Sequence, residues 1–300
     1  MFYREAGQFK TSYHADQAIF PIRQDLYFYF ILMGVAFIGV PLLASEYFLS
    51  TLMLPFLILS LAALGLNILT GYAGQLSLGT GGFMATGAFA AYKLSTAFPN
   101  MHLLVVFLLS GVVSAGVGIL FGIPSLRIKG FYLAVATLAS QFFLIWMFNK
   151  FGWFTNYSAS GVISAPPRTV FGDVFITGPN AGPIAKYLFC LSIVVVLALI
   201  AKNLTRSNIG REWMAIRDMD IAAEIIGIPM LKTKLIAFAI SSFYCGVAGA
   251  LWAFMYTGSV EPLAFDVNRS FQVLFIISIG ALGSIRAPFR GAGFLCWLPF

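Results

Sequence analysis

The amino-acid sequence predicts an all-α fold, a polytopic bundle of about eight transmembrane helices. Two features of the composition indicate this: 60% of the 300 residues are hydrophobic and only 10% are charged, whereas about a quarter of the residues of a soluble domain are charged. The mean hydropathy is +0.90. The third observation is a pattern, because apolar runs long enough to cross a bilayer recur along the chain between polar segments.

Eight apolar runs approach or reach the length of about 17 to 25 residues that a membrane-spanning helix requires. They cover residues 26–44, 48–69, 78–98, 103–123, 131–148, 181–201, 235–256 and 271–285. The first run starts late and lacks a convincing cleavage site, so we expect an uncleaved span and not a signal peptide. Residues 1–25 then form a polar N-terminal segment, and residues 26–285 form the membrane domain.

The distribution of Lys and Arg orients these spans. If the N-terminus is cytoplasmic, the inner segments hold thirteen of these residues and the outer loops hold four, in agreement with the positive-inside rule. We therefore expect residues 1–25 in the cytoplasm. This topology explains the net charge of +7. Nucleic-acid binding does not, because it would need the basic residues on one soluble face.

Residues 202–234 form the longest charged segment between two spans. Counting at the helical period places its apolar residues on one stripe and its charged residues on a neighbouring stripe. The apolar stripe consists of Met214, Ile221, Ile225 and Ile228, and the charged stripe of Arg217, Asp220 and Glu224. Gly227 and Pro229 end the helix. We expect one amphipathic helix with its apolar side on the membrane domain; a loop anchor and a docking site for a soluble partner both fit this pattern.

A glycine-rich stretch covers residues 65–92 and contains no acidic or basic residue. Gly81 with Ala85, and Gly87 with Ala91, have the four-residue spacing that lets helix backbones approach closely. Glycines also permit an interrupted helix that lines a cavity. Polar side chains in the stretch favour a water-lined translocation path, and the candidates are Asn67, Gln75, Ser77 and Thr80.

Two outer loops follow from the predicted topology. Residues 149–180 form a loop long enough to be functional, either as a docking surface for an external partner or as a passive cap. Residues 257–270 form the other, in which we expect Glu261, Asp266 and Arg269 to be solvated.

Several chemical signatures do not occur in the sequence. It has no GxxxxGK(S/T) loop, so the chain does not bind and split ATP in the usual way. No predicted span carries Asp or Glu near its middle, the usual sign of a proton relay, and Lys93 lies near the outer end of its span. The three cysteines have unrelated spacings. We therefore predict a protein that is not an enzyme and has no catalytic residues, metal site or cofactor.

Three motifs in this order carry a family resemblance. They are LTGYAGQLSLGTGGFMATGAFAAY at 69–92, PSLRIKGFYLAVATLA at 124–139 and GREWMAIRDMDIAAEIIGIPMLKTKLIAFAISSFYCGVAGALWA at 210–253. Together they resemble the branched-chain amino-acid ABC transporter permease family, over nearly the whole chain. The resemblance implies a multi-pass protein of the bacterial inner membrane, embedded in lipid, with no nucleic-acid partner.

The resemblance also implies partners and a coupling segment. Family members pair with a second, related permease, are driven by cytoplasmic ATPase subunits, and receive leucine, isoleucine or valine from a periplasmic binding protein. AAEIIGIP at 222–229 is similar to the loop with which such permeases engage their ATPases. The implied coupling residues are Arg217, Asp220, Ala222, Ala223, Glu224, Gly227 and Pro229.

Other functions stay open at this point. Related permeases handle urea, short amides or other amino acids. A secondary amino-acid carrier would work without nucleotide and would favour an ionisable residue inside a span, and a membrane scaffold would tolerate loss of the segment 210–229.

The C-terminal residues 286–300 depart from the family pattern. Family members continue after GALGS (280–284) with a small-residue apolar segment, whereas this chain has Arg286, Pro288 and Arg290. Residues 291–300 are about half the length needed to cross a membrane. We expect a truncated or altered end, with a naturally short tail as the alternative.

Overall fold

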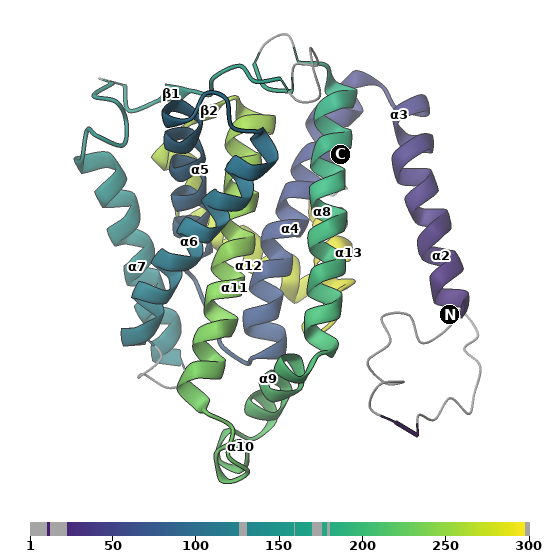
Figure 1. Cartoon of the computed structure of the whole chain (residues 1–300), viewed down its shortest axis with the longest axis vertical. Coiled ribbons are helices and arrows are strands. Elements are labelled where there is room, and N and C mark those ends of the chain that lie inside the picture. Colours follow the sequence, from purple (N-terminus) through teal and green to yellow (C-terminus); the bar gives the residue numbers. More distant parts are fainter. Residues whose placement is uncertain are drawn as a thin grey trace.

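The computed structural model describes residues 11–12, 23–125, 131–158, 160–169, 176–178 and 181–297. The all-α prediction is confirmed, because the regular structure of these residues is helical apart from one pair of two-residue strands (Figure 1). Strand β1 (Ile163–Ser164) pairs antiparallel with β2 (Ser259–Val260), and Ile163 lies opposite Val260.

The helical elements are labelled as in Figure 1. Those of the first half are α2 (Arg23–Gly34), η1 (Val35–Gly39), α3 (Val40–Leu43), η2 (Phe48–Met53), α4 (Leu54–Asn67), η3 (Ile68–Tyr72), α5 (Thr80–Ala97), α6 (Leu103–Ser125) and α7 (Phe131–Lys150). Those of the second half are α8 (Pro183–Arg206), α9 (Asn208–Asp218), α10 (Asp220–Ile225), α11 (Met230–Leu251), η4 (Trp252–Thr257), η5 (Pro262–Phe265), α12 (Val267–Gly280) and α13 (Ala287–Trp297). Elements η1 to η4 are π-helical and continue or begin longer helices, whereas η5 is a short 3-10 turn.

Seven helical runs in the described part of the chain are long and apolar enough to cross a membrane. They are Leu26–Leu43, Phe48–Tyr72, Leu103–Pro124, Tyr132–Lys150, Pro183–Arg206, Met230–Thr257 and Pro262–Gly280. The remaining predicted span, at residues 78–98, corresponds to α5. Its 18 residues include three glycines, several hydroxyls and Lys93, which make α5 less apolar than the other seven. Most of α5 is nevertheless buried inside the bundle.

The predicted limits of the last span are wrong. The sequence pattern placed an outer loop at 257–270 and a span at 271–285, whereas the apolar helical run covers Pro262–Gly280. The charged residues Asp266 and Arg269 concealed its start from a count of hydropathy. α12 ends at Gly280, where Ala281 takes a φ of +74° and the chain turns. Arg269 therefore belongs to the first turn of α12.

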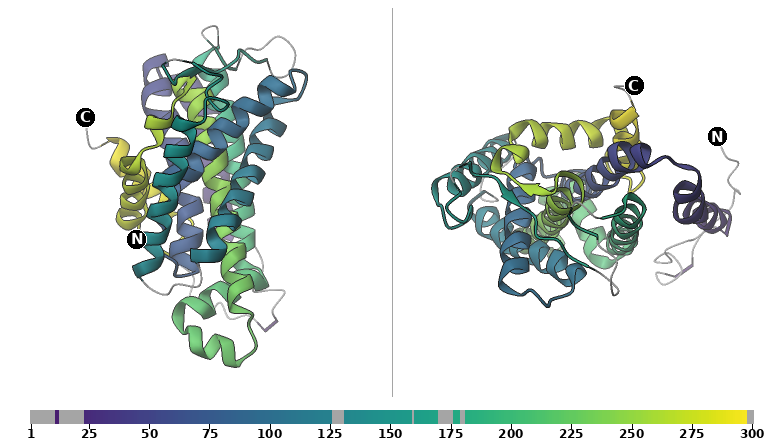
Figure 2. Two further views of the ribbon diagram at one scale, coloured as in Figure 1. Left: turned by 90° about the vertical axis from the view of Figure 1, so that its left-hand side faces the viewer. Right: turned by 90° about the horizontal axis from the view of Figure 1, so that it is seen from above.

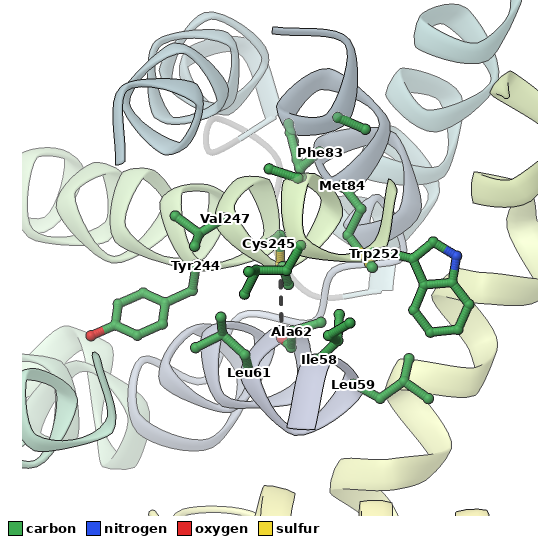
Figure 3. Packing of buried hydrophobic residues seen from close by; sticks show 14 of the residues in the cluster. Ile58, Leu59, Leu61, Ala62, Phe83, Met84, Tyr244, Cys245, Val247 and Trp252 are labelled. Atoms are coloured by element: carbon green, nitrogen blue, oxygen red, sulfur yellow. Dashed lines mark hydrogen bonds between the residues drawn. The ribbon is translucent and has the colours of Figure 1, made fainter. Parts of the chain in front are cut away.

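Helix α11 lies at the centre of the bundle and packs against α4, α5 and α6 (Figures 1 and 2). Its glycines allow this, because a Cβ at Gly249 would overlap the backbone of Met84 in α5. A Cβ at Gly87 in α5 would in turn overlap the carbonyl of Gly246. The close backbone packing predicted for the glycine-rich stretch is thus present at Gly87. On the other side, the thiol of Cys245 faces the carbonyl oxygen of Ala62 at 3.8 Å (Figure 3).

The first span stands beside the bundle instead of within it (Figures 1 and 2). None of the apolar window in Leu26–Leu43 is buried. Two tyrosines connect the span to the rest of the chain. The hydroxyl of Tyr187 donates to the carbonyl oxygen of Ala36 at 3.1 Å, and Arg286 donates to the hydroxyl of Tyr29 at 3.0 Å. The exposed apolar side chains of this span suit contact with lipid.

The C-terminal helix α13 folds back on α12 and also packs against α4 (Figure 2). A Cβ at Gly291 would overlap the carbonyl of Ile276, so the two helices are in backbone contact. With 11 residues, α13 is about 16 Å long, which is too short to cross a membrane.

Candidate functional site: coupling segment and polar path

The segment α9–α10 projects from one end of the bundle (Figure 1). The sequence predicted one continuous amphipathic helix here, and this prediction is wrong. α9 ends at Asp218 because Met219 is extended, with φ −151° and ψ 96°, and α10 starts afresh at Asp220. The break changes the direction in which the second helix presents its side chains. Ile221 and Ile225, predicted to rest on the membrane domain, are 69% and 81% exposed.

Residues outside the predicted apolar stripe attach α9 to the bundle. Trp213 is completely buried, and its indole N–H donates to the carbonyl oxygen of Thr233 at 3.0 Å. The hydroxyl of Thr233 lies 3.3 Å from a carboxylate oxygen of Glu212. These bonds fix α9 to the first turn of α11. The sequence pattern did not single out Trp213, although a tryptophan in a polar segment was a usable signal of an anchor.

Arg217, predicted to lie on the side facing water, is partly exposed and also reaches the bundle. Its Nη1 donates to the carbonyl oxygen of Gly71 at 2.8 Å, and its Nε pairs with the carboxylate of Asp218 at 2.9 Å. Arg217 therefore links the end of α9 to η3. A charge-assisted bond of this kind holds two elements in register more strongly than a neutral one.

The other predicted coupling residues form the tip of the segment. Asp220 opens α10, Ala222 and Glu224 are exposed, and Ala223 is buried. The predicted end of the helix is confirmed at Gly227, whose φ is +89° and whose N–H donates to the carbonyl oxygen of Glu224 at 3.0 Å. Pro229 is the N-cap of α11.

The tip is unusually apolar for a surface at the end of a membrane domain. Four large side chains there are more than two thirds exposed: Met219, Ile221, Ile225 and Ile226. We call these four residues the apolar tip. Nothing in the described part of the chain covers them, and a cluster of this kind is typical of a protein contact surface.

The predicted interruption of the glycine-rich stretch is present between η3 and α5. Residues 73–79 are not helical, and most of them are buried. Both side-chain amide atoms of Gln75 and the hydroxyl of Thr80 are buried without a hydrogen-bond partner among the described residues. Ser77 is also buried, and its hydroxyl accepts from the N–H of Gly79 at 3.3 Å. Buried polar atoms without partners are rare and indicate water or ligand.

Asn67, the fourth predicted path residue, is fully buried but is used differently. Its amide nitrogen donates to the carbonyl oxygen of Ser284 at 2.9 Å, and its amide oxygen accepts from the N–H of Gly283 at 3.1 Å. Both ends of the amide thus hold the turn between α12 and α13. Gly283 also lies next to Gly71 and Arg217. We call Asn67, Gly71, Arg217 and Gly283 the basal junction.

A second polar cluster, which the sequence pattern missed, caps the start of α5. The hydroxyl of Ser270 accepts from the N–H of Gly81 at 2.8 Å, and Oε1 of Gln141 accepts from the N–H of Gly82 at 2.5 Å. Gln141 donates in turn to the carbonyl oxygen of Phe265 at 2.8 Å. Gln141, which is polar within a predicted span, was a signal; Ser270 gave none.

The described parts of the outer segment are tied to α5. Lys93 donates to Oδ1 of Asn156 at 2.5 Å and lies 4.5 Å from the centre of the Trp153 ring. Arg168 donates to the carbonyl oxygens of Ser95 and Pro99. Trp153 and Tyr157 stay exposed. A docking surface and a passive cap both remain predictions for this segment.

The fold and this site define a polytopic membrane protein with a projecting helical segment. The family model described as "Branched-chain amino acid transport system / permease component" matches residues 48–297. The chain therefore belongs to this family of permease components. The match includes the coupling segment, the glycine-rich stretch and α13.

Individual relatives agree with the family match. The chain is 34% identical over 242 residues to the high-affinity branched-chain amino acid transport system permease protein LivM of Salmonella typhimurium, covering 74% of this chain and 56% of that protein. It is 32% identical over 257 residues to LivM of Escherichia coli, covering 79% and 58%. A probable LivM of Methanocaldococcus jannaschii is 24% identical over 225 residues, covering 73% and 61%.

The chain thus spans a little over half the length of the bacterial relatives that it matches. No solved structure matches the chain.

Proposed function

We propose that this chain is the permease subunit of an ATP-driven importer of branched-chain amino acids, and that it forms the translocation path with a second permease. One observation carries the proposal: the segment α9–α10 is fixed to the bundle at Trp213 and Arg217 and yet presents an apolar tip to a partner. The names of the LivM relatives supply the substrate class.

The apolar tip is the proposed contact with a cytoplasmic ATPase. The contact includes Asp220, Ala222 and Glu224, while Ala223, Gly227 and Pro229 shape α10 and its end. This assignment places the N-terminus and the tip on the cytoplasmic side, as the positive-inside rule favours, and places the outer segment toward a substrate-binding protein. The membrane is then the bacterial inner membrane.

Movement of the ATPases would reach the path through the basal junction. Arg217 joins α9 to the carbonyl of Gly71, and the non-helical residues 73–79 follow directly in the chain. A rigid-body rocking of the bundle would therefore displace the segment that holds Gln75, Ser77 and Thr80. We propose these three residues as lining the path, and Asn67 as part of the junction that moves it.

The direct test is uptake of radiolabelled leucine into proteoliposomes. They contain this chain, its second permease and the ATPase subunits, with and without internal ATP and external binding protein. We expect uptake that requires both. ATP-independent uptake would favour a secondary carrier. Uptake of urea or short amides in place of leucine would change the substrate class that we assign to the importer. No uptake of any of these compounds by a correctly assembled complex would refute the proposal.

A further inference from the structure

Arg269 is a half-buried cation that pairs with no acidic group among the described residues. It lies in the first turn of α12, within the span Pro262–Gly280. Its Nη1 donates to Oε1 of Gln272 at 2.6 Å, and its Nε points to the carbonyl oxygen of Ala264 at 3.4 Å. No carboxylate within the described ranges forms an ion pair with it. Charged groups in membrane spans are costly and mark functional sites by default.

The depth of Arg269 follows from its neighbour Ser270. Ser270 caps the N–H of Gly81 at the start of α5, whereas the outer segment is attached to α5 at Lys93 and Ser95. Fourteen residues of α-helix separate Gly81 from Ser95, which corresponds to about 20 Å along the axis of α5. The backbone of α12 beside Arg269 therefore lies far from the attachment of the outer segment, and the Arg269 side chain is half-buried.

Trp252 provides a second donor at the same place. The guanidinium carbon of Arg269 lies 4.1 Å from the centre of the Trp252 ring. The residue is only 5% exposed, and its indole N–H is buried without a partner among the described residues. Figure 3 shows the indole extending from η4 toward the yellow C-terminal ribbon, away from Leu61 and Ala62. A buried N–H without a partner next to a half-buried cation suits a negatively charged acceptor.

A cleft at the outer end of the bundle lies beside the aromatic ring that packs on Trp252. The rings of Trp252 and Tyr256 are 4.6 Å apart. Tyr256 also lines a cleft of about 340 Å³, together with Ser50, Thr51 and Lys186. Tyr256 lines this cleft and packs on Trp252, so it separates the cleft from the pair of donors.

We propose that Arg269 and the indole N–H of Trp252 bind the carboxylate of an amino acid on its way through the protein. The inference rests on the proposed import function and assigns its carboxylate-recognition site. A guanidinium has five N–H donors, and the two bonds to Gln272 and Ala264 leave donors for a carboxylate. The ligand would also supply the negative charge that the site lacks, so the site selects amino acids over neutral amides.

The test compares leucine with leucinamide, which has the same side chain and ammonium group but no carboxylate. Competition against radiolabelled leucine binding is measured with the assembled importer without its external binding protein, which would impose a preference of its own. Uptake is measured separately with the complete importer. For the wild type we expect leucinamide to compete at least about tenfold more weakly than leucine, because a charge-assisted bond is lost. In Arg269→Gln this preference should fall to near parity while leucine uptake drops. Arg269→Lys should keep part of the preference, and Trp252→Phe should reduce it while retaining the ring.

Lys93→Gln is the matched control, because Lys93 also lies over a tryptophan and donates to an amide, but at the outer end of α5. It should leave the preference unchanged. An Arg269→Gln importer that keeps the wild-type preference for leucine over leucinamide overturns the inference. Loss of uptake in both Arg269→Gln and Arg269→Lys, with this preference unchanged, overturns it as well. If Arg269→Gln does not assemble, Arg269→Lys and Trp252→Phe decide. A wild-type importer that takes up no amino acid fails the proposed function instead.

Discussion

Arg217 shows how one side chain can serve two elements of this protein. Its Nε pairs with Asp218 in the same helix, while its Nη1 reaches the carbonyl oxygen of Gly71. The planar guanidinium can make both bonds at once, and a lysine ammonium cannot reproduce that fork. Arg217 therefore links α9 directly to η3.

We expect Arg217→Glu to uncouple transport without preventing assembly. The reversed charge cannot donate to Gly71 and repels Asp218, so ATP hydrolysis would no longer move η3. Leucine uptake should fall about tenfold or more, while the ATPase subunits still copurify with the chain. Lys232→Glu is the matched control, because it makes the same charge change at an exposed position at the start of α11. Equal uptake by the wild type and Arg217→Glu would contradict the coupling role.

At the scale of elements, sequence periodicity predicted spans well and the coupling segment poorly. Long apolar runs determine helices by themselves, and Gly227 and Pro229 end α10 through local backbone preferences. The break at Met219 has no such local signal. The bonds of Trp213 and Arg217 to residues far along the chain determine the position of α9, and a helical count cannot include them. We assigned Arg269 to an outer loop because we took a charged residue to exclude a membrane span.

The contact between α5 and α11 makes a prediction about packing. Gly87→Ala places a methyl group against the carbonyl of Gly246, and such overpacking typically costs about 1–3 kcal/mol of unfolding free energy. Gly116→Ala in α6 is the control, because a Cβ there meets nothing within 4 Å and gains up to about 1 kcal/mol of helix propensity. Thermal unfolding in detergent should show a lower midpoint for Gly87→Ala alone. An equal decrease in both variants would contradict the packing explanation.

At the scale of the whole molecule, charge and projection indicate the same orientation. Among the described residues, six basic side chains lie in or next to α9–α10, namely Lys202, Arg206, Arg211, Arg217, Lys232 and Lys234, and the segment with Lys93 and Asn156 lies at the other end. The sequence alone could predict this orientation, because the positive-inside rule needs only the number of Lys and Arg residues in each loop. It could not supply the separate position of the first span or the return of α13, since both depend on contacts between distant residues.

The orientation can be tested at the apolar tip. Cys190 and Cys245 are buried and Cys296 is half-buried, so a cysteine introduced by Ile225→Cys would be the more accessible thiol. We expect a membrane-impermeant maleimide to label it in inside-out vesicles and not in intact cells. The unsubstituted protein gives the background. Labelling in intact cells would place the tip outside and would overturn both the orientation and the ATPase contact.

Helix α12 has a mechanical consequence that follows from where its two ends lie. Arg269 lies in its first turn, and its last residue, Gly280, precedes the turn with Gly283 beside Asn67 and Arg217. The helix is unbroken over 14 residues, about 20 Å, so it acts as a stiff rod without a hinge. If the end of α12 beside Arg217 moves with the ATPases, the guanidinium of Arg269 would move with it. The nucleotide state of the ATPases would then control when a bound carboxylate is released.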